Sequence, residues 1–378
     1  MKKTTLALLV ALASVPAAVN AQTGSAAQSA EPFKVGTFGI DGDETVGIVL
    51  RDEFVINLEA ANAAMEATRS YPAREMPDDM IELIEDYNDG LKERIYAIVS
   101  DIVAANSLTS NRPDYIHTVG DVDTMAPIPR PRLIMNTAVN FYSHIAESAN
   151  AETRQRLIAE RRANRSVPYM FLKAPSSIIG NDDTILIPWG RTELDWEIEL
   201  AVIMGEPTRY VPATEALDNI FGYTIMLDIS DRGGRPAGGA IGGVDWFVMK
   251  GQDTFGPMGP WIVPREFYGN PMEQLNQTLI VDGQQMQSAD ASDMIHSVGE
   301  VIEYASSLVT VMPGDIIGAG TSGGVGMGTS VRGEQVWLVE GDEITATIDG
   351  IGTLHMYVEA APEPRAGTGA YLPPVDED

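Results

Sequence analysis

The chain has 378 residues, 44% of them hydrophobic, which is enough for one large or two ordinary globular domains. Its 25 Lys and Arg face 54 Asp and Glu, and the formal net charge of −29 argues against binding to nucleic acid or to an anionic lipid surface. The absence of cysteine excludes disulfides, thiolate zinc sites and cysteine nucleophiles, and four scattered histidines argue against a zinc site built on several of them.

The first 21 residues have the layout of a secretory signal peptide. Lys2 and Lys3 precede a short apolar stretch, Leu6–Ala13, and small residues then lead to a cleavage site after Ala21. The alternative is an N-terminal membrane anchor, but the apolar stretch is well short of the ~20 residues that a transmembrane helix needs. We therefore expect export to the periplasm or secretion, with no membrane span after cleavage.

Residues 22–128 are expected to form a small N-terminal unit of strands and helices. Short β-like runs come first and two amphipathic segments follow. The expected strands are Val35–Ile40, Thr45–Leu50 and Phe54–Leu58, and the expected helices are Asn62–Arg69 and Asp78–Ala105. The proline-rich run Ala126–Arg132 indicates the connection to the next unit.

Strands predominate in residues 129–361, which we expect to form a second, larger domain. Frequent turn sequences separate short runs rich in Val, Ile and Thr, without regular βαβ alternation. Helices are expected at Phe141–Ala163, Ala213–Phe221 and Val298–Leu308. Residues 362–378 are acidic and proline-rich and are expected to form a loosely packed tail. The predicted fold class is therefore α+β and β-rich, with a smaller N-terminal α/β unit.

One segment of the larger domain carries acidic residues where a core strand would be apolar. A strand alternates its faces, so Asp195, Glu197 and Glu199 share one face, and apolar side chains occupy the other. Burying such charges without partners costs roughly several kcal/mol. No Lys or Arg lies between Thr192 and Glu206, so a hard divalent cation is the candidate partner.

Asp228 is the natural third oxygen ligand, because it ends the apolar run Ile225–Leu227 immediately before a loop. The alternative is that Glu197 and Glu199 line a solvated edge strand. Asp195 is more ambiguous and is either an acid that supports the site or a surface residue.

His144 and Glu147 lie three residues apart, one helical turn, so they can share a face and form a hydrogen bond. A carboxylate that accepts from one imidazole nitrogen leaves the other nitrogen basic, which suits a histidine that acts on water or on a carbon acid. Taken alone, the pair is also consistent with a histidine that serves packing or the surface.

Three cations stand out in a chain that is short of them. Lys173 and Lys250 are embedded in apolar sequence, and Arg232 follows Asp228 by four residues. Each could hold a substrate carboxylate or an oxyanion, or could pair with one of the many acids. The sequence leaves both interpretations open.

Two glycine-rich loops complete the candidate features. Gly233–Gly243 lies between Asp228 and Lys250 and is either a lid or only a long loop. Gly318–Gly326 offers backbone N–H groups that could cradle an anion, but it lacks the Gly-Lys-Ser/Thr ending of a P-loop.

Taken in order, these segments resemble the fumarylacetoacetate hydrolase family from roughly Leu133 to Val358. Each motif is weak alone, but seven in the family's order are specific. The motifs are Asn140–His144 with Glu147, Phe171–Lys173, Leu194–Leu200, Phe221–Thr224 through Asp228–Arg232, Lys250 through Gly259–Trp261, Pro313–Asp315, and Gly320–Thr321.

The resemblance implies a mixed β-sandwich-like roll, usually a homodimer, with a Mg²⁺ or Mn²⁺ site; Ca²⁺ is an alternative. The positions that match metal ligands are Glu197, Glu199 and Asp228. The positions that match catalytic groups are His144 and Glu147, as a water-activating pair, and Lys250 at the oxyanion. The positions that match substrate-holding groups are Tyr142, Lys173, Arg232 and Thr321.

Family members cleave or rearrange β-diketo and 2-oxo acids, so we expect a metal-dependent hydrolase of a carbon–carbon bond in an acylpyruvate. The alternatives are a decarboxylase, tautomerase or dehydratase of a 2-oxo acid, and a non-catalytic exported binding protein. Two positions depart from the family's pattern. Arg235 stands where many relatives carry Gln, which bears on substrate recognition, and Asn140 stands where some carry a further acid, which indicates a three-carboxylate site.

Overall fold

The computed structural model describes residues 31–69, 71–234, 245–329 and 332–366. The predicted signal peptide, Arg235 with most of the Gly233–Gly243 loop, and most of the acidic tail lie outside the described residues. Within the described residues, no helix combines the length and the apolarity that a membrane crossing needs.

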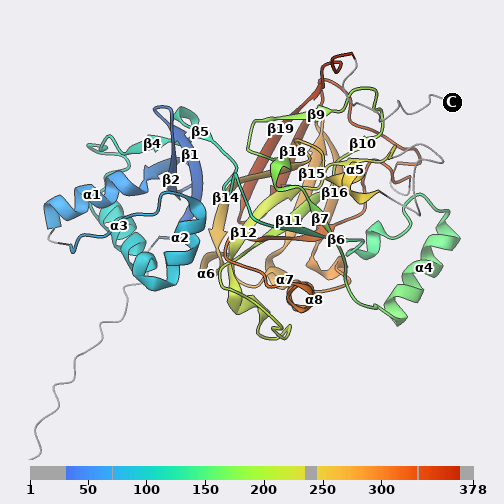
Figure 1. Ribbon diagram of the computed structural model, residues 1–378, viewed down its shortest axis with the longest axis horizontal. Coiled ribbons are helices and arrows are strands. Elements are labelled where there is room, and N and C mark those ends of the chain that lie inside the picture. Colours follow the sequence, from blue (N-terminus) through green and yellow to red (C-terminus); the bar gives the residue numbers. More distant parts are fainter. Residues whose placement is uncertain (1–30, 70, 235–244, 330–331, 367–378) are drawn as a thin grey trace, which may run out of the picture.

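The N-terminal unit is a small antiparallel sheet covered by helices (Figure 1). Its strands are β1 (Lys34–Ile40), β2 (Asp43–Leu50), β3 (Phe54–Asn57), β4 (Ile116–Thr118) and β5 (Asp123–Thr124). Its helices are α1 (Leu58–Arg69), α2 (Met80–Asp86) and α3 (Lys92–Ala104). The three predicted strands are confirmed to within a few residues at each end.

The helical segment predicted over Asp78–Ala105 is confirmed, but it is not one regular helix, because a π-helical turn, Tyr87–Leu91, separates α2 from α3. Gly90 lies there at φ 89°, a conformation that suits glycine and interrupts the regular helical hydrogen bonds. Periodicity alone does not show this interruption, since apolar residues continue on both sides of it.

One twelve-stranded sheet joins the N-terminal unit to the β-rich part of the chain. Strand β1 pairs with β14 (Gly256–Pro264), with Val35 opposite Ile262. The order then continues through β12 (Ile220–Leu227), β11 (Ile198–Met204), β17 (Ile316–Thr321), β6 (Ile134–Ala138) and β7 (Tyr169–Lys173). Strand β11 therefore lies between two neighbours, and the solvated-edge alternative for its acidic residues is wrong.

A second, five-stranded sheet packs against this one and encloses the main apolar core. Its strands are β16 (Gln284–Asp290), β15 (Asn276–Val281), β18 (Glu343–Ile348), β19 (Gly352–Ala360) and β9 (Thr184–Ile187). Three helices flank the β15–β16 hairpin along the chain: α6 (Arg265–Tyr268), α7 (Pro271–Gln274) and α8 (Val298–Leu308). The bounds of α8 are as predicted, because Ser297 and Glu300 form a capping box at its start. The fold is α+β and strand-rich, as predicted.

The other two helices predicted in this part form only in part. Only α4 (Ala151–Ala163) forms within Phe141–Ala163, because the Asn150 side chain caps its first turn and Ala146 adopts φ 47°. Within Ala213–Phe221 there is a 3₁₀ turn, Ala216–Asn219, and the β-branched and aromatic run that follows forms β12.

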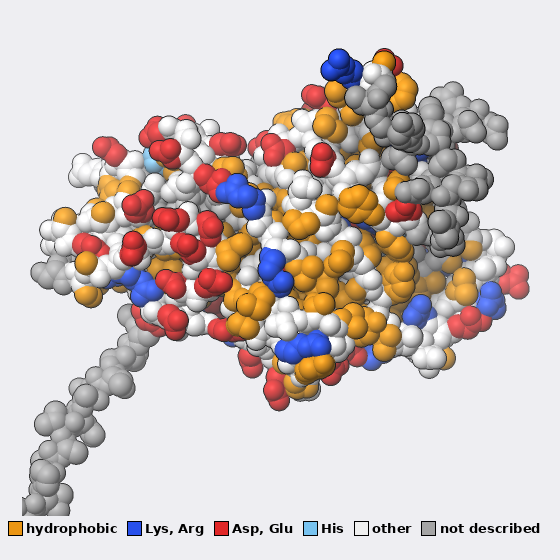
Figure 2. Space-filling view, viewed as in Figure 1, with side chains coloured by type: hydrophobic (Ala, Val, Ile, Leu, Met, Phe, Trp, Pro, Cys, Tyr) orange, Lys and Arg blue, Asp and Glu red, His pale blue; other side chains and the backbone are white. Residues whose placement is uncertain are grey.

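The two parts of the molecule differ at their surfaces. On the face drawn in Figure 2, acidic side chains gather over the N-terminal unit, whereas hydrophobic side chains spread over the β-rich part. Helix α4 has no buried residue and lies at the far end of the molecule from the N-terminal unit (Figure 1).

Candidate metal centre

The acidic segment is two short strands with a break between them. Strand β10 (Leu194–Asp195) pairs with β13 (Ser230–Asp231), and β11 begins only at Ile198. At the break, Glu197 has φ 140°, a region that L-residues other than glycine rarely adopt. Its carbonyl accepts a hydrogen bond from the Asp228 N–H at 2.9 Å, which joins the break to the end of β12. The regular alternation predicted from Asp195 onward is therefore wrong at this residue.

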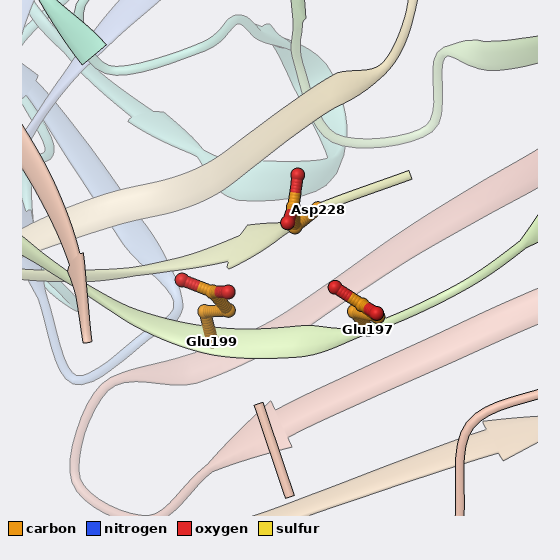
Figure 3. Close-up of side chains that lie close together, drawn as sticks. All are labelled: Glu197, Glu199 and Asp228. Carbon is orange, nitrogen blue, oxygen red and sulfur yellow. The ribbon is translucent and has the colours of Figure 1, made fainter. Parts of the chain in front are cut away.

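Glu197, Glu199 and Asp228 nevertheless meet. Each offers one carboxylate oxygen, and these atoms lie within 4.8 Å of one another. Figure 3 shows the two glutamates on one segment and Asp228 on the segment beside it. All three are almost fully buried, with exposures of 4%, 1% and 1%. Three buried carboxylates this close together form the kind of oxygen-rich site that a hard divalent cation prefers.

Asp195 does not belong to the group of three ligand candidates, because its carboxylate bonds to other partners. Its Oδ1 accepts from the Gly326 N–H at 2.6 Å, and its Oδ2 accepts from Arg232 Nε at 2.9 Å. It is fully buried, so the surface alternative for Asp195 is wrong. Through Arg232 it supports the position of Glu197, to which the same guanidinium also donates.

Cations that are distant in the sequence lie around the carboxylates. Lys173 Nζ donates to Asp228 Oδ1 at 2.7 Å. Lys250 Nζ donates to Glu197 Oε2 at 2.7 Å and to Asp228 Oδ2 at 2.6 Å. The lack of a nearby Lys or Arg in the sequence therefore does not mean that the acids lack cationic partners. Lys173, Lys250 and Arg232 all pair with acids, as one of the two interpretations held.

Glu199 differs from its neighbours, because no cation bonds to it among the described residues. Its Oε2 accepts from the Asn136 side-chain amide at 3.0 Å and from the Gly320 N–H at 3.1 Å. Asp195, Glu197 and Asp228 are matched by the three cations, so Glu199, when ionised, brings one excess negative charge into the cluster. The cluster therefore has room, in electrostatic terms, for a further positive charge.

The pKa shifts reflect this imbalance. Burial and repulsion from Asp228 and Glu197 raise the pKa of Glu199 well above its ordinary value. Burial opposes ionisation of Glu197 as well, but Lys250 and Arg232 hold its pKa below the ordinary value. Burial lowers the pKa of Lys173, against the attraction of Asp228. A bound divalent cation would stabilise the ionised form of Glu199, so the residues fit the metal that the resemblance implies.

His144 and Glu147 form the predicted hydrogen-bonded pair, although no α-helix carries them. A 3₁₀ turn, Tyr142–His144, and the left-handed Ala146 bring His144 Nδ1 to 2.6 Å from Glu147 Oε1. Glu147 is buried, and its other oxygen accepts from the Gly324 N–H at 2.7 Å. This arrangement leaves His144 Nε2 facing the carboxylates, 4.0 Å from Glu197 Oε1.

The glycine-rich loop Gly318–Gly326 forms hydrogen bonds with carboxylate side chains of the site. Its N–H groups donate to the carboxylates of Glu199, Glu147 and Asp195. A side chain at Gly318 would collide with the Glu199 carboxylate. The predicted anion cradle is therefore present, but its partners are the acids of the site.

One pocket opens onto these groups. It is lined by Thr137, Ala138, Val139, His144, Phe171, Glu197, Glu199, Asp228, Arg232, Trp246, Lys250 and Thr321. Thr321 is part of this lining, and its hydroxyl donates to the Ile198 carbonyl at 2.8 Å. Lys173 is buried and is not part of the lining. Tyr142 is not part of it either and lies under the Arg162 guanidinium.

Several lining residues were not predicted from the sequence. Phe171 belongs to the family motif Phe171–Lys173, and Trp246 lies one helical turn before Lys250 on α5 (Trp246–Lys250). Their positions beside Lys173 and Lys250 in the sequence could have indicated that they line the same pocket. Val139 gave no such signal, because neither its residue type nor its spacing indicates a pocket.

Comparison with known sequences identifies similar proteins. Residues 133–359 match the family described as fumarylacetoacetate (FAA) hydrolase, C-terminal. A 2,4-didehydro-3-deoxy-L-rhamnonate hydrolase from a Sphingomonas species is 38% identical over 191 residues, which are 50% of this chain and 65% of that protein. The chain thus spans just under two thirds of that relative. An uncharacterized protein from Pyrococcus abyssi is 39% identical over 231 residues, 61% of this chain and 92% of that protein.

Solved structures give the same picture. A crystal structure of maleylpyruvate hydrolase from Sphingobium sp. SYK-6 has a TM-score of 0.61 at 27% identity and covers 87% of this chain and 100% of that one. A second structure of maleylpyruvate hydrolase from that strain, in complex with manganese(II) ion and pyruvate, has a TM-score of 0.60 at 26% identity, with the same coverage. A 2-hydroxyhepta-2,4-diene-1,7-dioate isomerase from Mycobacterium marinum has a TM-score of 0.60 at 25% identity, and the match covers 88% of this chain and 100% of that one. Hydrolases and an isomerase thus share this fold.

Proposed function

The chain belongs to the fumarylacetoacetate hydrolase family through its C-terminal domain, and on this basis we propose that it is a divalent-metal-dependent hydrolase of an acylpyruvate or related β-diketo acid. The membership confirms the resemblance seen in the motifs. The observation that carries the proposal is the buried group of Glu197, Glu199 and Asp228 with His144 Nε2 beside it.

We propose that Glu197, Glu199 and Asp228 hold Mg²⁺ or Mn²⁺, with Ca²⁺ as an alternative. The manganese and pyruvate in one structure of a related hydrolase support this choice. Such a cation would supply Lewis-acid polarisation of the carbonyl of a 2-oxo acid and would offset the negative charge that develops when the carbon–carbon bond breaks. Lys173 would fix the carboxylate of Asp228, and Arg232, which lines the pocket, would fix that of Glu197.

His144 is the proposed general base. Its Nδ1–H donates to Glu147, which fixes the ring and leaves the lone pair on Nε2 directed toward the pocket. Nε2 would take a proton from water as the water attacks the distal carbonyl, and Glu147 would stabilise the imidazolium that forms. The Gly324 N–H keeps Glu147 in place during the transfer.

Lys250 is the proposed oxyanion donor, because it lines the pocket. Two of its bonds are short, but the third, to the Asp228 carbonyl, is long at 3.4 Å. A substrate oxygen can replace this weakest partner without breaking the ion pairs. Thr321 also lines the pocket. Its hydroxyl donates to the Ile198 carbonyl and accepts from Gln287, so it would bind a substrate oxygen only by turning its O–H away from Ile198.

A lyase or isomerase acting on a 2-oxo acid is the second candidate, since the Mycobacterium marinum neighbour is named an isomerase. The two candidates differ in their need for a base that acts on water. Turnover that survives His144→Ala but disappears on metal removal would favour isomerisation, decarboxylation or dehydration over hydrolysis.

The direct test is to assay the chain from residue 22 with Mn²⁺ against a panel of acylpyruvates, with pyruvate release measured by coupled reduction with lactate dehydrogenase. We expect turnover that chelation abolishes and added Mn²⁺ restores. No turnover across the panel, with Mn²⁺ still bound, would favour the non-catalytic binding protein instead.

We also propose that residues 129–361 form the catalytic domain and that residues 22–128 support it. We further propose that the protein is exported and that it forms a homodimer. The signal-peptide layout of residues 1–21 supports export, and the family resemblance supports the dimer. Fractionation of cells that express the full chain should place the protein in the periplasm or medium. Light scattering should give about twice the monomer mass of the cleaved chain; a monomer mass would contradict the dimer.

A further inference from the structure

The pocket is lined by charged groups and by apolar side chains. The charged ones include the metal-ligand candidates and Lys250. We call the larger apolar ones, Val139, Phe171 and Trp246, the apolar wall; it adjoins the charged groups, because Lys250 Nζ lies 5.3 Å from the centre of the Phe171 ring. The Phe171 and Trp246 rings are stacked, with centroids 4.8 Å apart and an interplanar angle of 22°, and Tyr169 extends the aromatic group outward at 5.6 Å from Trp246. Stacked rings of this kind form a flat, rigid surface for an apolar or aromatic group.

Val139 stands at this wall in a conformation that is costly for valine. Its φ is 51°, in the left-handed region where a β-branched residue is a genuine outlier. The next residue, Asn140, is buried and fixed by bonds to the Ala319 and His296 carbonyls and from the His296 N–H, so the backbone cannot relax easily. Val139 itself is 43% exposed and gains little from core packing. Strain of this kind is often kept at a binding site.

The cations of the pocket are already engaged. Among the described lining residues, only Arg232 and Lys250 are Lys or Arg, and both donate to carboxylates of the site. A second carboxylate at the far end of a substrate would therefore find no uncommitted cation among these residues. It would also lie beside the negative cluster.

We propose that Val139, Phe171 and Trp246 bind the acyl group of the substrate, and that this group is uncharged and apolar, aromatic rather than a second carboxylate. The proposal rests on the function proposed above, with the 2-oxo acid end directed to the metal centre. The acyl group would then lie against the stacked rings, and Val139 would cover its edge.

Three probes test this specificity: benzoylpyruvate, fumarylpyruvate with its distal carboxylate, and acetylpyruvate as a short reference. With Mn²⁺ present we expect kcat/KM for benzoylpyruvate to exceed that for fumarylpyruvate by about tenfold or more, the scale of a mismatched pocket contact. A preference for fumarylpyruvate would overturn the proposal while leaving the hydrolase function intact. No turnover of any of the three probes would instead remove the proposed function, and this inference with it.

Two variants locate the specificity. Val139→Asn and Trp246→Ala should each lower the ratio of kcat/KM for benzoylpyruvate over acetylpyruvate by about tenfold. Val139→Asn should also keep or raise the Tm, because Asn tolerates a positive φ. Val339→Asn is the matched control, an exposed valine that is not part of the pocket lining, and it should leave the ratio unchanged. An unchanged ratio in both pocket variants would overturn the assignment of this wall.

Discussion

Two carboxylate sites in this molecule differ in the charge that surrounds them. At the junction between the N-terminal unit and the β-rich part, Glu266 of α6 is a single carboxylate that accepts several hydrogen bonds. Its Oε1 accepts from Lys92 Nζ at 2.8 Å, from Tyr87 Oη at 2.8 Å and from Tyr96 Oη at 3.0 Å. In the metal centre, Glu197, Glu199 and Asp228 crowd together, and Glu199 has no bonded cation among the described residues.

The pKa values show the same contrast. Burial opposes ionisation of Glu266, but hydrogen bonds from Lys92, from its own backbone N–H and from Tyr87 keep its pKa below the ordinary value. Burial and like charges raise the pKa of Glu199. A carboxylate with more donors than it needs stabilises the fold, whereas one that is short of positive charge is suited to bind an ion. The two groups should therefore respond in opposite ways to removal of their charge.

The largest expected effect is on catalysis. Glu199→Gln should lower kcat/KM by about 10³-fold or more, because a metal ion at such a site contributes several kcal/mol of transition-state stabilisation. Without metal, its Tm should be equal to or higher than that of the wild type, because the substitution removes like-charge repulsion. Steady-state kinetics and thermal unfolding in chelator measure both. Full activity of Glu199→Gln, or a fall in its Tm of several degrees, would contradict the view that Glu199 binds an ion and does not stabilise the fold.

Substitution of the proposed general base, His144, should have the second-largest effect. His144→Gln should lower kcat by roughly 10²–10³-fold, the usual contribution of general-base catalysis, and Glu147→Gln should have a smaller effect because it acts through His144. Both variants should retain Mn²⁺ affinity within about threefold, since neither residue belongs to the three-carboxylate group. A greater loss with Glu147→Gln than with His144→Gln would contradict the assigned roles.

Glu266→Gln should affect stability and leave catalysis intact. We expect a loss of about 1–2 kcal/mol in the free energy of unfolding at pH 7, because charge-assisted hydrogen bonds are lost. The folded-state pKa of Glu266 is depressed, so this contribution is present above the unfolded-state pKa near 4.3 and is lost as pH falls through the folded-state value. Urea unfolding of both proteins at pH 7 and pH 4 measures it. A difference that grows on acidification would have the wrong sign.

Asp79 provides the smallest reference effect. This exposed carboxylate caps α2, and its Oδ1 accepts from the N–H groups of Ile81 and Glu82. Asp79→Ala should lower the free energy of unfolding by about 1 kcal/mol, as loss of an N-cap does elsewhere. Urea unfolding measures it, and a greater loss of stability with Asp79→Ala than with Glu266→Gln would contradict this order.

Local chemistry in the sequence was enough to predict part of this structure. Ser297 and Glu300 mark the start of α8, and the acids at positions 197, 199 and 228 identify the candidate metal ligands by residue type. The family motifs predicted the fold of residues 133–359, because their order carries more information than any one of them.

What the sequence did not show depends on long-range pairing and on single backbone conformations. Lys173 meets Asp228 across 55 positions, and no local pattern predicts that partner. The positive φ of Glu197 and of Val139 arises from the strands and buried side chains around them, because neither residue type favours it. The 3₁₀ turn at Tyr142–His144 replaced a predicted helix yet preserved the contact between His144 and Glu147, since the contact needs proximity and not a particular helix.

Titration calorimetry of Mn²⁺ into three purified proteins, the wild type, Glu199→Gln and Glu266→Gln, measures the difference between the two carboxylate groups. We predict one strong site per chain in the wild type and in Glu266→Gln, and a loss of affinity of at least about tenfold in Glu199→Gln. Equal affinity in Glu199→Gln and the wild type would contradict the assignment of Glu197, Glu199 and Asp228 as a metal centre.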